Sequence, residues 1–298
     1  MTPRCTVQSG DVCGEAATWD ADRGLLYWCD INRFLLHVFD AKIDTVTTTQ
    51  FDEPVTAISL TDKDGWLLIA LGSGLILFNP ETRAREDLAN GALAGWPELR
   101  FNDGRSDPTG AFWIGSMGNN VGPKGEALPP TDGMGALYRY RSGTGLVAFE
   151  TGIGIPNTLC WAPDDRTFYF GDTLKNEIRA YPFDPATGDI GDATSFFAGF
   201  ERGLPDGSAM DAEGYLWNCR FGGGCIVRIA PSGDIDQVID MPVENITTCT
   251  FGGADLKTIF ITTAGAERAG QGSLEGSIFT LRVKTPGLAE NRFSVIDT

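Results

Sequence analysis

The sequence of 298 residues predicts an all-β fold, and more specifically a six-bladed β-propeller. Its 38 Gly and 16 Pro, together with many Thr, Val, Ile, Phe and Trp, are typical of short strands joined by turns. Helical periodicity is sparse along the chain. A phrase of short aromatic strands separated by turns with Asp or Pro recurs six times, and repeats of about 40–50 residues of this kind are typical of propeller blades.

The six copies succeed one another along the chain, at residues 18–46, 58–87, 104–118 with 135–149, 159–190, 208–239, and 250–265 with 276–283. Successive turn aspartates are separated by 42, 45, 57, 47 and 44 residues; they are Asp20, Asp62, Asp107, Asp164, Asp211 and Asp255. We expect one domain over residues 1–298. Pairing of the C-terminal FSVIDT with the N-terminal segment is expected to close the ring, because closure removes exposed sheet edges.

The longest interval contains an insertion, NNVGPKGEALPPTDGMG at residues 119–135, whose Gly and Pro predict a loop. We expect this loop to form a lid over one end of the ring. A β-sandwich followed by a second domain is the alternative architecture, but no linker-like change in composition supports it.

Charge and composition exclude several classes of function. The net charge of −17, with no local cluster of Lys and Arg, opposes binding to nucleic acids and to anionic membranes. The N-terminus lacks the apolar segment of a signal peptide, and no run of 18 apolar residues predicts a membrane span. The seven cysteines form no CxxC pair, and Cys29, Cys160 and Cys249 stand in hydrophobic runs typical of buried thiols. A cytoplasmic location is expected.

Four polar residues stand just before the first hydrophobic strand of a copy: Glu15, Asn102, Asn157 and Asp206. Equivalent positions in successive blades lie at equivalent radius and height, so these side chains are expected to converge on the central channel. Two carboxylates with amide oxygens form a hard ligand set that suits Ca²⁺, Mg²⁺ or Mn²⁺ better than Zn²⁺. The competing interpretation is structural, since Asn and Asp before Gly are common turn residues.

Other polar and aromatic residues are expected to be structural. Asp103 is expected to bond neighbouring main chain, and the turn aspartates that recur in every copy are expected to be part of their turns. We expect Trp28, Trp113, Trp161 and Trp217 to pack between blades. The single histidine, His37, stands within a strand and is expected at the surface or a sheet edge, which argues against a catalytic triad.

Four phrases in order also resemble a known family: RFNDG with DPTGAFWIGSM, IPNTLCWAPDDRTFYFGDT, LPDGSAMDAEGYLWNCRFGGG and CTFGGADLKTIFITTA. This is the senescence marker protein, gluconolactonase and regucalcin family of six-bladed propellers, and the resemblance covers nearly the whole chain. It implies one divalent metal at the mouth of the channel, held by Glu15, Asn157 and Asp206. It also implies that Arg100 and Asn102 contact substrate hydroxyls. Ca²⁺ is the first candidate, followed by Mg²⁺, Mn²⁺, Zn²⁺ and Fe²⁺.

The resemblance implies metal-dependent hydrolysis of a small-molecule sugar lactone, an aldonolactone, to the aldonate, with Asp206 as the catalytic residue that accepts a proton from the attacking water. Where some members of the family place a Glu before the GALY strand, this chain has Thr131 and Asp132, so substrate preference does not carry over. The alternatives are a calcium-binding regulatory propeller without turnover, a related ester or phosphotriester hydrolase, and a scaffold that binds partners on one face.

Overall fold

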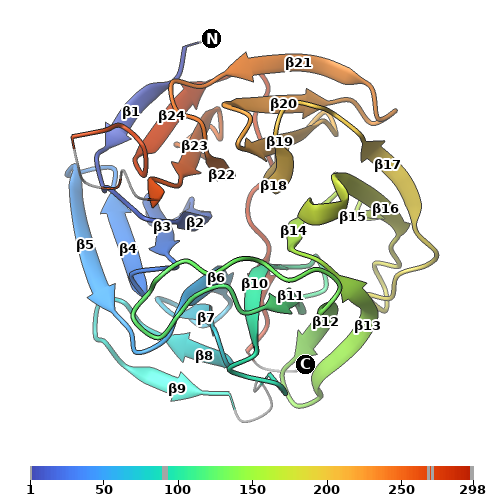
Figure 1. The fold of residues 1–298 in the computed structure, drawn as a ribbon, viewed down its shortest axis with the longest axis horizontal. Coiled ribbons are helices and arrows are strands. Elements are labelled where there is room, and N and C mark those ends of the chain that lie inside the picture. Colours follow the sequence, from blue (N-terminus) through green and yellow to red (C-terminus); the bar gives the residue numbers. More distant parts are fainter. Residues whose placement is uncertain (1, 89–92, 267–268, 270–271, 296–298) are drawn as a thin grey trace.

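The computed structural model describes residues 2–88, 93–266, 269 and 272–295, which form six sheets arranged as blades in a ring around a central axis (Figure 1). Five sheets have four strands and one has five, which confirms the predicted six-bladed β-propeller. The one helix whose residues are all described is the short 3₁₀ helix η1 (Thr173–Lys175). No helix in this part of the chain is long and apolar enough to cross a membrane.

In each blade the first strands in the chain lie toward the centre of the ring, and the strands that follow them lie successively further out. Blades 1 and 2 contain β2 (Gly14–Asp20), β3 (Leu25–Asp30), β4 (Leu35–Asp40), β5 (Thr45–Gln50), β6 (Val55–Thr61), β7 (Leu67–Leu71), β8 (Leu75–Phe78) and β9 (Arg85–Asp87). Blades 3 and 4 contain β10 (Leu99–Ser106), β11 (Phe112–Gly118), β12 (Gly135–Arg141), β13 (Gly145–Ile153), β14 (Pro156–Trp161), β15 (Thr167–Asp172), β16 (Glu177–Pro182) and β17 (Thr194–Ala198). Blades 5 and 6 contain β18 (Leu204–Met210), β19 (Leu216–Phe221), β20 (Cys225–Ile229), β21 (Ile235–Asp240), β22 (Ile246–Gly252), β23 (Thr258–Thr263) and β24 (Ile278–Arg282).

The ring is closed by the N-terminal segment, but not in the predicted way. Strand β1 (Arg4–Val7) pairs antiparallel with β24 and forms the outer edge of blade 6. The expected pairing of FSVIDT with the N-terminus was wrong, because β25 (Arg292–Phe293) pairs parallel with β6 in blade 2. Residues 296–298 of that phrase lie outside the described residues.

The hydrophobic core is divided into six clusters, each between two neighbouring blades. One cluster joins Leu36 of blade 1 to Ile69 of blade 2, and another joins Trp113 of blade 3 to Phe168 of blade 4. Blades are therefore covered on both faces, which explains why strands such as β7 are hydrophobic throughout. The four tryptophans lie in these clusters, so their predicted role in packing is confirmed; they are Trp28, Trp113, Trp161 and Trp217.

Five of the six turn aspartates hold their own turns, as predicted. Asp62 is the exception, because its carboxylate accepts from Val295 N at 2.9 Å and Thr61 Oγ1 holds that turn instead. Asp107 accepts hydrogen bonds from the main-chain N–H groups of Thr109 and Ala111 at 2.8 and 3.0 Å and from Trp113 Nε1 at 2.8 Å. In blade 5, Asp211 accepts hydrogen bonds from the main-chain N–H groups of Glu213 and Tyr215 and from Trp217 Nε1, each at 3.0 Å. Each of these carboxylates therefore ties a turn to the interface between blades.

His37 is buried, which corrects the expectation of a surface or edge position. Its ring stacks on Trp28 with centroids 4.8 Å apart, and its Nδ1 lies 2.9 Å from Thr48 Oγ1. It is held in blade 1 because β4 lies between β3 and β5, with both faces covered. All seven cysteines are free thiols, and Cys29, Cys160 and Cys249 are buried, as predicted.

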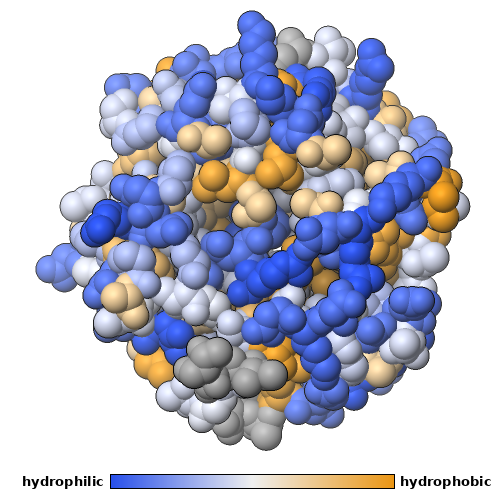
Figure 2. All heavy atoms as spheres, turned by 180° about the vertical axis from the view of Figure 1, so that it is seen from behind, coloured by the Kyte–Doolittle hydropathy of each residue, from blue (hydrophilic) through white to orange (hydrophobic). Residues whose placement is uncertain are grey.

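A C-terminal strap, residues 286–295, crosses the channel at the end opposite the lid. Figure 1 shows this red segment passing behind the centre of the ring from blade 6 toward blade 2. Main-chain hydrogen bonds hold it to blades 5 and 3, from Leu288 N to Met210 O and from Ser294 N to Gly110 O. Figure 2 shows this rear face as mostly hydrophilic, with apolar side chains in small patches.

Candidate metal and substrate site

The predicted site residues lie within the inner strands, near their first residues, and not just before the strands as expected. Glu15 is on β2, Asn102 on β10, Asn157 on β14 and Asp206 on β18. The carboxyl groups of Glu15 and Asp206 are in hydrogen-bonding contact, and Asn102 Nδ2 lies 3.4 Å from Asn157 Oδ1. The fold thus brings together residues that are nearly 200 positions apart in the sequence.

A β-bulge interrupts each of these strands at the level of the site. The register shifts between Glu15 and Thr18 on β2, and again at the corresponding places on β10, β14 and β18. A bulge breaks the two-residue alternation of a strand and re-aims a side chain, here toward the channel. Two residues that follow predicted ligands are in the left-handed region, Ala16 with φ 57° and Thr158 with φ 54°.

The Glu15–Asp206 pair is electrostatically unfavourable without a third group. Burial, followed by the charges of Asp206 and Asp103, raises the pKa of Glu15 well above its usual value. Burial, followed by the charge of Asp103, likewise raises the pKa of Asp206. Two carboxyl groups in contact require either a shared proton or a cation between them. The arrangement therefore suits either a shared proton or a bound cation.

Asn157 is oriented so that its amide oxygen faces the other site residues. Its Nδ2 donates to Thr173 Oγ1 at 2.8 Å, and Thr173 Oγ1 in turn donates to the carbonyl of Pro205 at 2.7 Å. Because the amide nitrogen is engaged outside the site, Oδ1 remains toward Asn102. Asn157 is only 3% exposed, so its amide is oriented by protein contacts, chiefly by the hydrogen bond to Thr173. Thr173 was not identified from the sequence.

Arg100 and Asn102 form a buried pair whose hydrogen bonds are directed mainly at the protein. Arg100 Nη1 donates to Asn102 Oδ1 at 2.7 Å and to Phe101 O at 2.8 Å, and its Nε and Nη2 both donate to Asn120 Oδ1. Asn102 Nδ2 donates to Pro156 O at 2.9 Å. Of the five N–H groups of the guanidinium, one on Nη2 is left for a ligand. Burial lowers the pKa of Arg100 to about 10.

Asn120 belongs to the predicted lid and was not recognised from the sequence. The lid runs from β11 to β12 and crosses in front of β6 toward blade 1, where Asn32 Nδ2 donates to Gly125 O at 2.7 Å (Figure 1). Val121 is buried in the cluster between blades 1 and 2. The pair NN directly after a strand was the available signal, and its meaning became clear only through the contact with Arg100.

Asp103 lies one residue further along β10 and bonds main chain, in agreement with the expectation. It accepts hydrogen bonds from the N–H groups of Gly104 and Thr158. Burial raises its pKa, while the charge of Arg105 lowers it. Asp103 thus adds a third negative group that acts on both Glu15 and Asp206.

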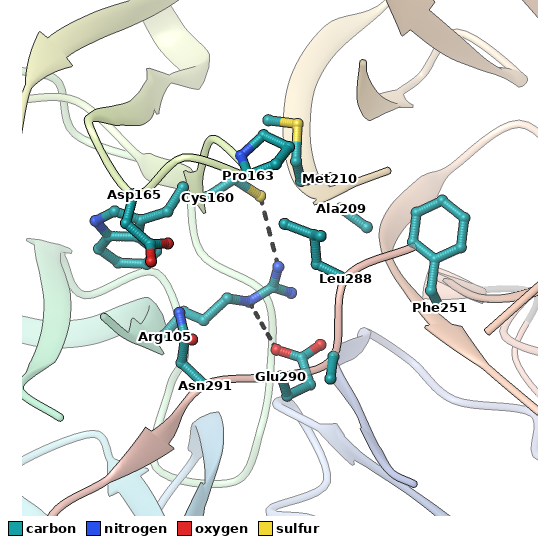
Figure 3. A pocket seen from close by; sticks show the side chains of 12 residues that line it. Arg105, Cys160, Pro163, Asp165, Ala209, Met210, Phe251, Leu288, Glu290 and Asn291 are labelled. Atoms are coloured by element: carbon teal, nitrogen blue, oxygen red, sulfur yellow. Dashed lines mark hydrogen bonds and ion pairs between the residues drawn. The ribbon is translucent and has the colours of Figure 1, made fainter. Parts of the chain in front are cut away.

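A cavity of about 230 Å³ lies at the strap end of the channel and is separate from the predicted site. Figure 3 shows the Arg105 guanidinium pointing across it, with contacts to Cys160 Sγ at 3.5 Å and Glu290 Oε2 at 3.6 Å. None of the predicted ligands lines this cavity, so it is not the predicted metal site.

Three or more His, Cys, Asp and Glu side chains arranged to hold a metal are not found among the described residues. A cation at Glu15 and Asp206 would therefore need a ligand of another type, and the oxygen of Asn157 is of the required chemistry. The donor set consists of oxygen atoms only, which suits a hard divalent cation.

Comparison with known proteins identifies relatives along the full chain. The family model described as "SMP-30/Gluconolactonase/LRE-like region" matches residues 13–265. A 6-deoxy-6-sulfogluconolactonase from Pseudomonas putida is 32% identical, over 98% of this chain and 99% of the relative. Pentonolactonase XacC from Haloferax volcanii is 30% identical, over 99% of both chains.

Among solved structures, a protein described as a calcium-binding protein, regucalcin, from Agrobacterium tumefaciens superimposes with a TM-score of 0.87 at 29% identity. The similarity covers 98% of this chain and 97% of that structure. The ring of six blades, the four phrases in order and the matched family model agree with one another, and the chain belongs to the SMP-30/gluconolactonase/LRE-like family.

Proposed function

We propose that this protein hydrolyses a sugar-acid lactone to the aldonate, and that Glu15, Asn157 and Asp206 hold one divalent cation for this reaction. The names of two relatives, a sulfogluconolactonase and a pentonolactonase, support the reaction class. The observation that carries the proposal is the contact between the buried Glu15 and Asp206 carboxyl groups, because a proton or a cation must lie between them and a cation would also use the oxygen of Asn157.

The residues at the site fit a hard cation, and Ca²⁺ is the first candidate. Two carboxylates and one amide oxygen leave room for water or substrate oxygens in a coordination shell of six to eight, about the number that Ca²⁺ takes. The regucalcin structure described as calcium-binding supports the same choice. Mg²⁺, Mn²⁺, Zn²⁺ and Fe²⁺ are the alternatives, and metal titration decides among them.

In the proposed reaction a water molecule adds to the lactone carbonyl, the ring C–O bond breaks and the ring oxygen leaves as a hydroxyl. When bound, the cation would polarise the carbonyl and stabilise the oxyanion. Asp206 accepts the proton of the attacking water and returns a proton to the leaving ring oxygen. Burial and the charge of Asp103 make Asp206 a stronger base than an exposed aspartate, which offsets the opposite effect of a nearby cation.

Arg100 and Asn102 are proposed to contact substrate hydroxyls, but Arg100 makes most of its hydrogen bonds to the protein. Asn102 lies beside Asn157, whereas Arg100 holds Asn102 by its Oδ1 and the lid by Asn120. Arg100 therefore orients Asn102 and offers one further N–H to the substrate. An uncharged lactone is not repelled by the net charge of −17, and release of the anionic product is assisted.

A calcium-binding function without turnover is the second candidate, because the regucalcin structure is described by its calcium binding. The test is a panel of aldonolactones followed with a pH indicator, with Ca²⁺, Mg²⁺, Mn²⁺, Zn²⁺ or Fe²⁺ and with EDTA. Metal-dependent acid release that Asp206→Asn abolishes supports the lactonase. Tight Ca²⁺ binding with no hydrolysis of any lactone, aryl ester or phosphotriester supports the regulatory protein. Hydrolysis that is insensitive to EDTA contradicts the proposed metal dependence.

A further inference from the structure

The bulge that presents Asp206 is held by side chains from three neighbouring strands. The main-chain oxygen of Asp206 accepts hydrogen bonds from Thr158 Oγ1 at 2.5 Å and from Asn218 Nδ2 at 3.2 Å. Two residues later, Ser208 Oγ accepts a hydrogen bond from Asn218 Nδ2 at 3.0 Å, and the main-chain oxygen of Ser208 accepts one from Arg105 Nη1 at 3.0 Å. The bulge at residues 206–208 is therefore fixed at both of its ends.

Asn218 is the central member of this group. It lies on β19 directly opposite Ser208, and its side chain is fully buried. A single Nδ2 group bonds the peptide oxygen of Asp206 and the hydroxyl of Ser208, and so spans the bulge. The direction of the Asp206 carboxylate depends on the backbone of the bulge, which the Asn218 amide holds together with Thr158 Oγ1 without touching the carboxylate.

Arg220 determines which way the Asn218 amide points. Its Nη1 donates to Asn218 Oδ1 at 3.2 Å, so the amide oxygen faces the guanidinium and the amide nitrogen must face Asp206. The rest of the guanidinium is anchored: Nη2 donates to Asn176 Oδ1 at 2.7 Å and to Gly203 O at 2.5 Å. Arg220 is fully buried and has no carboxylate within salt-bridge distance among the described residues, so its contacts are to carbonyl and amide oxygens.

We propose that Asn218 is a positioning residue for the cation-binding site, which holds the Asp206 bulge in the orientation that binds the ion, and that Arg220 fixes the amide of Asn218. This inference rests on the proposed function, in which Asp206 is a ligand. The effect of Asn218 is geometric, since a neutral amide brings no charge to the site. Residues that orient metal ligands in this way typically change affinity by about 10–100-fold when they are replaced.

The test compares Asn218→Asp with the wild-type protein by calorimetric titration with Ca²⁺. Aspartate has the size of asparagine and can still accept the hydrogen bond from Arg220 Nη1. When ionised, however, it cannot donate a hydrogen bond to the main-chain oxygen of Asp206. Its added negative charge would tighten cation binding if charge alone mattered. If the inference is correct, binding weakens about 10-fold or more in spite of that charge, and kcat for the lactone falls with little change in KM.

A matched control comes from blade 6, where the corresponding bulge on β22 has Thr247 and Thr248 and no predicted ligand. Thr262 Oγ1, fully buried on β23, accepts from Thr248 N at 3.1 Å and contacts Thr247 Oγ1 at 2.8 Å. Thr262→Val removes this brace with little change in shape. We expect it to lower the melting temperature and to leave Ca²⁺ affinity within about twofold of wild type.

The outcomes separate this inference from the proposed function. Suppose that the wild-type protein binds Ca²⁺ and that Asp206→Asn abolishes this binding. If Asn218→Asp then binds Ca²⁺ as tightly as wild type or more tightly, the positioning role of Asn218 is wrong and the proposed metal site stands. If Asp206→Asn binds Ca²⁺ normally, the proposed site itself is wrong. Should Asn218→Asp fail to fold by circular dichroism, Thr158→Val removes the other donor to Asp206 O, and the same loss of affinity is required.

Discussion

Replacement of Asp206 by asparagine should stabilise the protein in the presence of EDTA while abolishing its response to cations. The Glu15 and Asp206 carboxyl groups are in contact. Two negative charges about 4 Å apart repel by about 4 kcal/mol at an effective dielectric constant of about 20. Retention of one proton by the pair reduces this cost. We therefore expect the free energy of unfolding of Asp206→Asn in EDTA to rise by about 1–2 kcal/mol at pH 8, a gain within the range of single stabilising substitutions.

The pH dependence of this gain has a definite sign. The native pKa of Asp206 is raised above its unfolded value, chiefly by burial. A carboxyl group of this kind contributes no penalty below its unfolded pKa of about 4, and it destabilises the native state progressively as the pH rises through the native pKa. The advantage of Asp206→Asn in EDTA is therefore smallest near pH 4 and largest at pH 8.

The assay is thermal unfolding followed by circular dichroism, in EDTA and at saturating Ca²⁺. At a Ca²⁺ concentration of 100 times Kd the wild-type protein should gain about 2.7 kcal/mol, and Asp206→Asn should gain nothing. Asp211→Asn is the matched control, because Asp211 is equally buried but bonds main chain and Arg228. That control should be less stable than wild type and keep its Ca²⁺ response. An Asp206→Asn protein that is less stable than wild type in EDTA would refute the reasoning.

Three further predictions concern the same region. Calorimetric titration should show Ca²⁺ affinity falling from pH 8 to pH 5.5, because burial raises the pKa of Glu15 and Asp206 and protons then compete with the ion; an affinity independent of pH would exclude these two ligands. Gly125→Ala should raise KM for the lactone several-fold and leave Ca²⁺ affinity unchanged, since a Cβ there would collide with Asn32 O and displace the lid; steady-state kinetics with an unchanged KM would show that the lid does not cover the substrate. Asn120→Ala should also raise KM and lower the melting temperature, because it removes the oxygen that accepts hydrogen bonds from Arg100 Nε and Nη2. Leaving a buried donor without its acceptor costs about 1–3 kcal/mol. A variant that matches wild type in both KM and melting temperature would contradict this role.

Much of the fold could be predicted because each blade repeats the same local pattern. The Asp-bearing turns hold themselves together through hydrogen bonds to the next few residues, as Asp107 does with Thr109 and Ala111, and such contacts are encoded locally. The expectations that were wrong depend on how strands pair and pack, which the local pattern does not encode. The C-terminal phrase pairs with β6 rather than with the N-terminus, and His37 is covered by Trp28 and the strands on either side.

The candidate site was predictable in its residues but not in their support. Glu15, Asn157 and Asp206 were found from their position before a strand and from family resemblance, and their role as ligands stays a prediction. Thr173, Asn120 and Asn218 were not found. Each acts on a residue that is more than ten positions away and on another strand or segment, so no local pattern identifies it.

By itself the sequence determined that the chain repeats a strand-and-turn unit six times and that acidic and amide side chains recur at one level of the repeat. These properties follow from turn chemistry and strand preference over a few residues. Only the tertiary structure decided that two carboxyl groups meet at Glu15 and Asp206, that Arg100 serves the lid as well as Asn102, and that the strap occupies the far end of the channel. Those facts depend on the radius and closure of the ring, which are set by packing between all six blades at once.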